Sequence, residues 1–201
     1  MAALCIQEYL MKLENLLSDL ELKGIENDSE VLDRSHKQLN ITKDTGEFLA
    51  ILVKSSCAET ILEVGTSNGY STLWLAAATS ESGKVTTLEV QQHKIDQAQV
   101  NFNKSGLGRK IDIVKSDASE YFEKSDKQFD FIFLDAERTE YMKFSKEVIS
   151  SLRMGGLLVC DNAISHEEEM AEFIGFIKNS NQFSTSLVPV GKGEFIAYKN
   201  A

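Results

Sequence analysis

Residues 60–89 read TILEVGTSNGYSTLWLAAATSESGKVTTLE, and this stretch decides the fold. It begins with a short apolar run from Thr60 to Val64 and continues through a glycine-containing loop into a helical stretch over about 70–79. It ends in a second apolar run from Val85 to Glu89. Strand, crossover helix and strand in this order predict a βαβ unit. Because both runs are apolar nearly throughout, the pattern indicates parallel strands with helices on both faces.

The same alternation continues along the chain. Further strands are expected at Ile111 to Val114, Phe129 to Leu134 and Leu157 to Cys160, and helices at about 93–104, 117–124, 139–152 and 166–179. The tail differs, because Phe183 to Val190 and Glu194 to Tyr198 flank a glycine-rich turn with no helix between them. This pattern predicts an antiparallel hairpin at the sheet edge. The fold class is therefore α/β, with a doubly wound and mostly parallel sheet.

The N-terminal part is expected to be helical. A helix over residues 2–22 places apolar side chains along one face at steps of four and three, namely Ile6, Leu10, Leu13, Leu17 and Leu20. Gly24 is expected to stop it. Packing on the core is the favoured role of this helix, since its stripe spans too few heptads for a convincing coiled coil; pairing with a second subunit as a homodimer is the alternative.

A short helix is expected in the polar stretch up to about Asn40, and Asp44 or Thr45 could cap a further helix. Length predicts a single domain over residues 1–201. We expect it to consist of an N-terminal helical segment, 1–56, and a Rossmann-like core, 57–201.

Composition excludes several classes of protein. Apolar residues make up 42% and charged residues 26%, as in globular chains, while 31 acidic against 21 basic residues leave a net charge of −10. This charge argues against nucleic acid and anionic membranes as partners. Cys5, Cys57 and Cys160 lack C-x-x-C spacing, which argues against a disulfide framework or thiolate metal site and favours a reducing cytoplasm. No apolar window is long enough for a membrane span, so we expect a soluble protein.

The loop after the first strand is a candidate ligand site, because parallel sheets bind ligands beyond the carboxyl ends of their strands. It runs from Glu63 through Gly65 and Gly69 into a helix whose free N–H groups could meet an anionic part of a ligand. The dinucleotide fingerprint G-x-G-x-x-G is absent, since Ser67 and Tyr70 occupy the places of its second and third glycines. A tight turn without a ligand is the alternative.

Two further strand ends carry acids. Glu89 lies twenty residues after Gly69, where nucleotide-binding folds place an acid that accepts the ribose hydroxyl hydrogens. A solvated strand-end glutamate is the alternative. Asp117 and Ala118 could border an adenine ring, although Asp117 serves equally well as a helix N-cap.

The last two parallel strands end in a set of oxygen donors. Asp135 closes FDFIFLD, and Asp161 with Asn162 closes GGLLVCDN. The two aspartates are 26 residues apart, enough for one helix between neighbouring strands, so the three side chains can converge. Two carboxylates and an amide suit Mg²⁺, Mn²⁺ or Ca²⁺ rather than zinc. Alternatively, Asp135 only touches a cofactor and Asp161 caps a helix.

Taken in order, these motifs resemble those of S-adenosylmethionine-dependent O-methyltransferases of the catechol and caffeoyl-CoA type, especially their small bacterial members. The resemblance covers about residues 39–198 and rests on LNITKDTGEFLA, LEVGTSNGYSTLWLA, VTTLE, KSDA, FDFIFLDAERTEY, GGLLVCDN and VPVGKGEFIAY. It implies the seven-stranded sheet of class I methyltransferases with a reversed last hairpin. It also implies methyl transfer from S-adenosylmethionine to a hydroxyl oxygen of a small catechol-like or phenolic acceptor.

The resemblance further implies roles for individual residues. The methionine portion of the cofactor would be held by Glu63, Gly65, Ser67, Gly69, Ser71 and the backbone of Ile41. Glu89 would bind the ribose, and Asp117 and Ala118 would lie beside the adenine. Asp135, Asp161 and Asn162 match the family's ligands for a divalent cation, here expected to be Mg²⁺, and Asp135 also borders the cofactor.

One position departs from the family pattern. Catechol-type members carry a lysine, a proposed general base, three positions after the first metal aspartate, whereas this chain has Arg138. A guanidinium stays protonated, so Arg138 is expected to steady a developing oxyanion or to pair with Glu137. The base is unassigned; His166 is one option and a solvent-facing histidine the favoured alternative, while His36 and His93 are interpreted as surface residues.

The acceptor itself cannot be identified from the sequence. After Asn162 the chain enters a helix directly, which does not support a bulky CoA ester as acceptor. Two other functions stay open. One is an S-adenosylmethionine-binding module without catalysis, and the other is an NAD-dependent oxidoreductase, which the missing glycines disfavour.

Overall fold

The computed structural model describes residues 2–200 and the side chains of all of these except 2–6 and 9. Predictions for the side chains of Cys5 and Ile6 therefore lie outside the described residues. One seven-stranded sheet has the order β3-β2-β1-β4-β5-β7-β6. Its strands are β1 (Thr60–Val64), β2 (Lys84–Glu89), β3 (Ile111–Lys115), β4 (Phe129–Leu134), β5 (Leu152–Cys160), β6 (Phe183–Val188) and β7 (Glu194–Lys199). β1 to β5 are parallel, and β7 and β6 run antiparallel, which confirms the predicted fold class.

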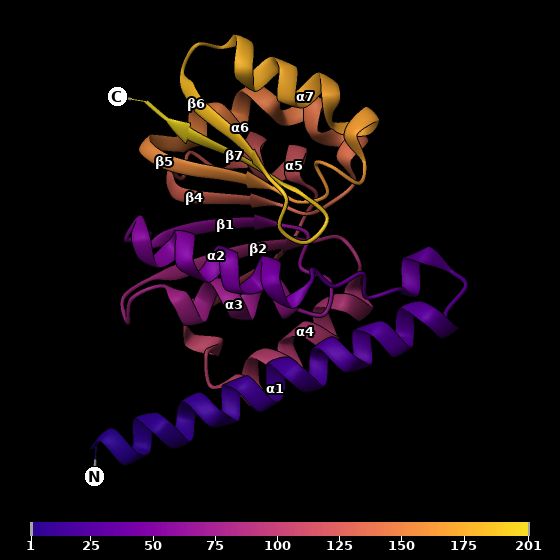
Figure 1. The fold of residues 1–201 in the computed structure, drawn as a ribbon, viewed down its shortest axis with the longest axis vertical. Coiled ribbons are helices and arrows are strands. Elements are labelled where there is room, and N and C mark those ends of the chain that lie inside the picture. The colour runs from indigo at the N-terminus through magenta and orange to yellow at the C-terminus, as the bar shows by residue number, and fades with distance from the viewer. Residues whose placement is uncertain (1, 201) are drawn as a thin grey trace.

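Helices cover both faces of the sheet (Figure 1). The α-helices are α1 (Ala2–Glu30), α2 (Lys43–Ser55), α3 (Tyr70–Ala78), α4 (Gln92–Ser105), α5 (Ala118–Lys124), α6 (Ser145–Ser151) and α7 (Glu167–Asn179). Three short 3₁₀ helices are η1 (Arg34–His36), η2 (Gly108–Lys110) and η3 (Arg138–Phe144). Side chains of α1 to α4 pack on one face and those of α5 to α7 on the other.

Alternate residues of each central strand enter opposite cores. Ile61 and Phe131 pack with the α1 to α4 side, whereas Leu62 and Ile132 pack with the α5 to α7 side. All four side chains are fully buried. Burial on both faces explains why these strands are apolar nearly throughout.

The prediction that Gly24 stops the first helix is wrong. α1 continues to Glu30, and Gly24 lies inside it. A Cβ atom at this position would lie 2.4 Å from Nδ2 of Asn40, which donates a hydrogen bond to the Leu20 carbonyl. The glycine therefore lets the returning chain pack against the helix rather than ending it. Leu13, Leu17 and Leu20 are buried as expected, whereas Leu10 is half exposed.

Smaller differences concern element ends. Neither Asp44 nor Thr45 is the N-cap of α2, because the N-cap is Thr42, two residues before Asp44. The stretch expected as one helix over 139–152 is divided into η3 and α6. β5 begins at Leu152 rather than Leu157, since an irregularity in its pairing with β4 lets five extra residues join the sheet.

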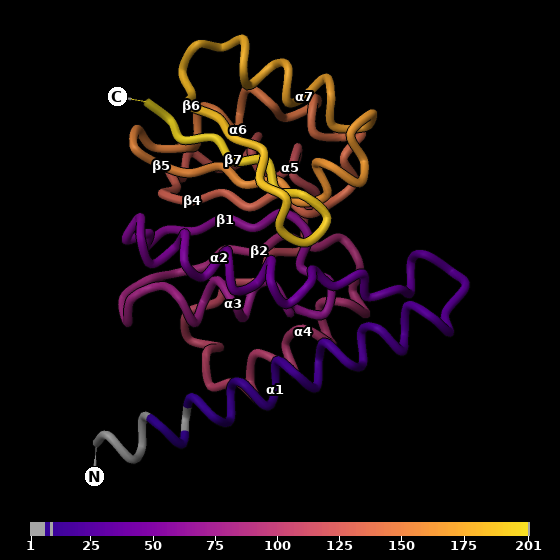
Figure 2. The backbone as a smooth tube through the Cα atoms, in the orientation of Figure 1, coloured from indigo at the N-terminus to yellow at the C-terminus, as the bar shows by residue number. Residues whose placement is uncertain are grey.

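The segment between α1 and α2 crosses the end of the molecule at which the parallel strands finish (Figure 2). It includes η1 and returns along the loop that follows β1, where the Ser67 hydroxyl donates a 2.6 Å hydrogen bond to the Gln38 carbonyl. Among the residues that the structure describes, no helix has both the length and the apolarity needed to cross a bilayer.

Candidate functional site

One large cavity of about 1200 Å³ opens at the carboxyl ends of β1, β2 and β4. Ten of the residues predicted from the sequence line it: Ile41, Gly65, Ser67, Ser71, Glu89, Asp117, Ala118, Asp135, Arg138 and Asn162. Glu63, Gly69 and Asp161 are buried and do not line the cavity. The structure therefore brings residues from the two halves of the sheet around a single space.

The loop after β1 is shaped by glycine at two positions. Gly65 has a φ of +105°, and a Cβ there would lie 2.1 Å from the Asp135 carbonyl oxygen. Gly69 has a φ of +86° and is packed against the Phe102 ring. The backbone N–H groups of Gly65 and Thr66 both donate to the Leu88 carbonyl, so the loop is held over the end of β2. These contacts explain why the chain needs glycine at both points.

Glu63 is fully buried beneath this loop. Its carboxyl group accepts hydrogen bonds from the hydroxyls of Ser71 and Thr87, both at 2.6 Å, and from Thr72. Burial raises the pKa of Glu63 to about 7, although the three hydroxyl donors oppose the shift. The side chain thus fixes Ser71, which does line the cavity, and makes no contact with the cavity itself.

Glu89 ends β2 at the cavity wall and is nearly buried. Oε2 accepts from the Ser67 N–H at 2.9 Å, and Oε1 accepts from the N–H groups of Val90 and Gln91. A carboxylate offers about four lone-pair sites, so one further donor can still be accepted. The predicted alternative of a freely solvated strand-end acid does not match this burial.

The predicted N-cap position of Asp117 is confirmed. Its Oδ1 accepts from the Glu120 N–H at 2.9 Å at the start of α5, and the residue also lines the cavity beside Ala118. Asp117 therefore fixes the start of α5 at the wall.

Asp135 and Asp161 follow the paired ends of β4 and β5. Leu134 and Cys160 are partners in the parallel register, and the Asp161 N–H donates to the Leu134 carbonyl at 3.1 Å. Burial raises the pKa of both aspartates, and the negative charge of Asp161 adds to the rise at Asp135. The two aspartates thus follow neighbouring strand ends, where Asp135 lines the cavity and Asp161 is buried.

Asn162 lies next to this pair. Its backbone N–H and its Nδ2 donate to the two carboxylate oxygens of Asp161, each at 2.7 Å, while its Oδ1 accepts from the Ser165 hydroxyl. Among the side chains that the structure describes, no group of three or more His, Cys, Asp or Glu is arranged to hold a metal. The donor set of two carboxylates and one amide nevertheless fits a hard cation in its chemistry, because it concentrates negative charge on oxygen.

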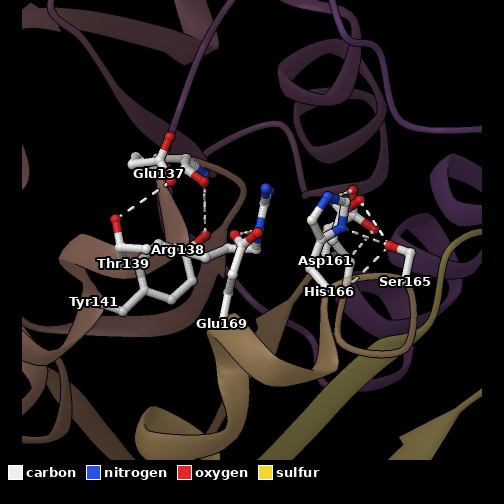
Figure 3. Close-up of polar contacts among 10 residues, drawn as sticks. Glu137, Arg138, Thr139, Tyr141, Asp161, Ser165, His166 and Glu169 are labelled. Carbon is white, nitrogen blue, oxygen red and sulfur yellow. Dashed lines mark hydrogen bonds and ion pairs between the residues drawn. The ribbon is translucent and has the colours of Figure 1, made fainter.

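Arg138 and His166 both line the cavity, and Figure 3 shows Arg138 beside Glu169 and His166 beside Ser165. Nε of Arg138 donates to Glu169 at 2.9 Å, and the Arg138 side chain is 7% exposed, so the predicted pairing with Glu137 is replaced by one with Glu169. Nδ1 of His166 contacts the Ser165 hydroxyl at 2.8 Å. His166 is half-buried and lines the cavity, so its interpretation as a solvent-facing residue is incomplete.

Sequence reasoning missed Glu194 and Lys192. Glu194 is fully buried at the start of β7, and Lys192 lines the cavity from the turn before it. Both lie near Asp161, since the Lys192 charge lowers the pKa of Asp161 while the Asp161 charge raises that of Glu194. Both residues belong to the sequence GKGE, which lies in the predicted turn of the hairpin. The sequence pattern did not show that this turn approaches the ends of the parallel strands.

A protein-family model described as O-methyltransferase matches residues 21–199. The chain belongs to the O-methyltransferase family. Catechol O-methyltransferase of Mycobacterium tuberculosis is 30% identical over 136 residues, which are 67% of this chain and 62% of that protein. Catechol O-methyltransferase of Niastella koreensis is 33% identical over 130 residues, or 63% of this chain and 59% of that protein. The chain thus matches less than two thirds of the length of these two relatives.

Solved structures show that the fold is that of other O-methyltransferases. An O-methyltransferase from Bacillus cereus, described in complex with SAH, superposes with a TM-score of 0.77 and 24% identity over 94% of this chain and 91% of that chain. At this identity the likeness concerns the fold alone. The resemblance noted from the sequence motifs is confirmed at the level of family and fold.

Proposed function

We propose that this O-methyltransferase-family chain transfers a methyl group from S-adenosylmethionine to a hydroxyl oxygen of a small catechol-like or phenolic acceptor, assisted by a divalent cation. The observation that carries the proposal is the single cavity of about 1200 Å³, which joins the Gly65 to Ser71 loop and Glu89 to the corner of Asp135 and Asn162. The methyl donor and an acceptor can therefore lie side by side.

The cofactor end of the cavity provides the contacts that S-adenosylmethionine needs. Glu89 keeps a free lone pair for a ribose hydroxyl, since backbone donors occupy three of its sites. Asp117 and Ala118 would border the adenine, and Ser67, Ser71 and the Ile41 backbone would approach the methionine portion. Glu63 and Gly69 would act indirectly, by holding Ser71 and the turn of the loop.

The acceptor end must hold a hydroxyl in line with the sulfonium methyl and favour its deprotonated form. A phenol with an ordinary pKa near 10 is mostly protonated at neutral pH. A divalent cation bound by Asp135, Asp161 and Asn162 would orient the acceptor oxygens and lower the pKa of the hydroxyl. Arg138, fixed by Glu169, supplies a permanent positive charge beside this corner, which would steady a developing oxyanion.

Transfer of isotope from labelled S-adenosylmethionine to a panel of catechols tests the proposal. We expect methylated product with Mg²⁺ and loss of activity after treatment with a chelator. Calorimetry with S-adenosylmethionine and with NAD separates this function from an oxidoreductase, because the loop lacks the phosphate-binding glycines. Binding of S-adenosylmethionine without transfer to any catechol would favour the noncatalytic module instead.

A further inference from the structure

The connecting segment between α1 and α2, residues 31–41, forms one side of the cavity. Eight of its eleven residues line it, from Leu32 to Ile41. Apart from η1 the segment has no regular structure, so its contacts with the rest of the chain hold it in place. Because the loop after β1 lines the same cavity, a cofactor bound there lies between this loop and the connecting segment.

Gln38 joins the connecting segment to the loop. Its carbonyl oxygen accepts a hydrogen bond from the Ser67 hydroxyl at 2.6 Å, and its Oε1 accepts from Nδ2 of Asn68 at 2.8 Å. Ser67 and Asn68 are successive residues of the loop after β1, and Asn68 is buried. Gln38 thus uses both its backbone and its side chain to contact the loop.

Asn68 carries this contact to two helices. Its Oδ1 accepts from the N–H of Tyr70, the first residue of α3, at 3.1 Å. Its carbonyl oxygen accepts from Nδ2 of Asn101 on α4 at 2.8 Å. The next residue of α3, Ser71, lines the cavity and is bonded to Glu63. A reoriented Asn68 amide would therefore disturb the part of the wall that is expected to meet the methionine portion.

The end of α1 holds Gln38 from the other side. The Gln38 N–H donates to Oδ1 of Asn27 and to Oδ1 of Asp28, both at 2.9 Å. The Leu39 N–H also donates to the Asp28 carboxylate, at 3.0 Å. Leu39 and Ser67 have φ values of +49° and +48°, a region that few non-glycine residues adopt. Such backbone strain persists where surrounding contacts hold it, and it concentrates at ligand sites.

We infer that Gln38 is a positioning residue for the cofactor, which couples docking of the connecting segment to the shape of the loop after β1. It acts through Asn68, whose amide holds the start of α3. Cofactor binding and docking of the segment should therefore stabilise each other. The inference rests on the proposed use of S-adenosylmethionine and adds to it a residue outside the expected cofactor contacts.

Calorimetric binding of S-adenosylhomocysteine tests this role without turnover. Gln38→Leu keeps a side chain of similar size but offers no acceptor to Asn68, and we expect about fivefold weaker binding, as for one lost hydrogen bond. Gln38→Glu keeps the acceptor oxygen and should bind within about twofold of the wild type. Gln99→Leu is the matched control, because Gln99 is exposed on α4 and does not line the cavity. It should keep the wild-type affinity.

A double variant tests whether Gln38 acts through Asn68. Asn68→Ala alone should weaken binding more than Gln38→Leu, because it also leaves the Tyr70 N–H without its acceptor. Adding Gln38→Leu to Asn68→Ala should change the affinity by less than about twofold, since the bond between the two side chains is already lost. Two full losses that multiply would contradict the coupling.

Limited digestion with trypsin tests docking of the connecting segment directly, because Arg34 lies in the segment and is exposed. Saturating S-adenosylhomocysteine should slow cleavage after Arg34 about fivefold or more in the wild type and less than about twofold in Gln38→Leu. Mass spectrometry of the fragments identifies the cut. At saturation the protection reports the coupling and not the affinity.

The outcomes separate this inference from the proposed function. If the wild type binds S-adenosylhomocysteine and Gln38→Leu binds it within about twofold as well, the inference is overturned and methyl transfer stands. Equal protection of Arg34 in both proteins would overturn it too. Gln38→Asn, whose amide is one methylene shorter, decides the same questions should Gln38→Leu not fold. Failure of the wild type to bind S-adenosylhomocysteine would remove the proposed function and, with it, this inference.

Discussion

The hydroxyl of Thr45 donates a 3.0 Å hydrogen bond to Glu194, although the two residues are 149 positions apart. This bond joins the start of α2 to the start of β7, where Glu194 lies near Asp161. The other carboxyl oxygen of Glu194 has no hydrogen-bond donor among the described residues. Burial and the charge of Asp161 raise the pKa of Glu194 to about 10. The side chain is therefore a neutral acid at pH 7, and its proton can bridge to Asp161.

Glu194→Gln should match the wild type in stability near pH 4.5, since glutamine keeps an acceptor for Thr45 and a donor for Asp161. Above that pH the unfolded wild type releases a proton that native Glu194 keeps, so the wild type loses stability relative to the variant. The difference should reach about 3 kcal/mol in favour of the variant at pH 7 and should grow further up to pH 10. Urea unfolding at pH 4.5, 7 and 9.5 in a chelator measures this difference.

Glu123→Gln serves as control for Glu194, since Glu123 is exposed. It should follow the wild-type pH dependence. A loss of several kcal/mol in Glu194→Gln already at pH 7 would show that Glu194 is ionised there and would contradict the neutral acid.

The raised pKa of Glu63 predicts a similar pH dependence of stability in a different pH range. Its pKa is about 7 when folded and near its ordinary value of 4.5 when unfolded. The native state therefore binds the extra proton between these values, and the wild type should lose up to about 3 kcal/mol of stability as the pH rises through this range. Glu63→Gln should not show this loss, whereas Glu172→Gln, an exposed control, should. A difference between Glu63→Gln and wild type that is equal at pH 5 and pH 8 would contradict the shift.

The sheet could be predicted from the sequence because burial on two faces leaves a simple pattern. Thr60 to Val64 and Phe129 to Leu134 are apolar strands whose observed bounds equal the predicted ones. Gly24 shows where local signals fail. A glycine is needed at this position because the Asn40 side chain, sixteen residues later, packs against it, and not because a helix ends there.

The candidate site could be predicted only where residues follow parallel strands. Glu89, Asp135 and Asn162 were accessible in this way, because the carboxyl ends of parallel strands meet at one edge. Glu194 and Lys192 belong to the antiparallel hairpin, whose approach to the same edge depends on the packing of α2. No spacing rule in the sequence gives that packing.

Gly65→Ala should damage both stability and cofactor binding. A side chain would force a strained φ and meet the Asp135 carbonyl oxygen at 2.1 Å. We expect a loss of about 3 kcal/mol in the free energy of unfolding. Affinity for S-adenosylmethionine should fall about tenfold or more, since the loop must move off β2. Gly175→Ala is the matched control, because no atom lies within 4 Å of a Cβ there, and this helical site should be unchanged or slightly stabilised.

Asp161→Asn should separate cation binding from folding. In the wild type, Mg²⁺ should raise the melting temperature, because a bound cation offsets the burial that raises the pKa of Asp135 and Asp161 and the repulsion from Asp161 that adds to the rise at Asp135. The asparagine variant removes one of the two carboxylates of the Asp135–Asp161 pair. The Mg²⁺-induced rise in melting temperature should therefore largely disappear, while the variant still folds. Asp112→Asn makes the same chemical change at an exposed position of β3 and should keep the full rise. An Mg²⁺-induced rise of equal size in both variants would show that the cation binds elsewhere, and the proposed ligand set would then be withdrawn.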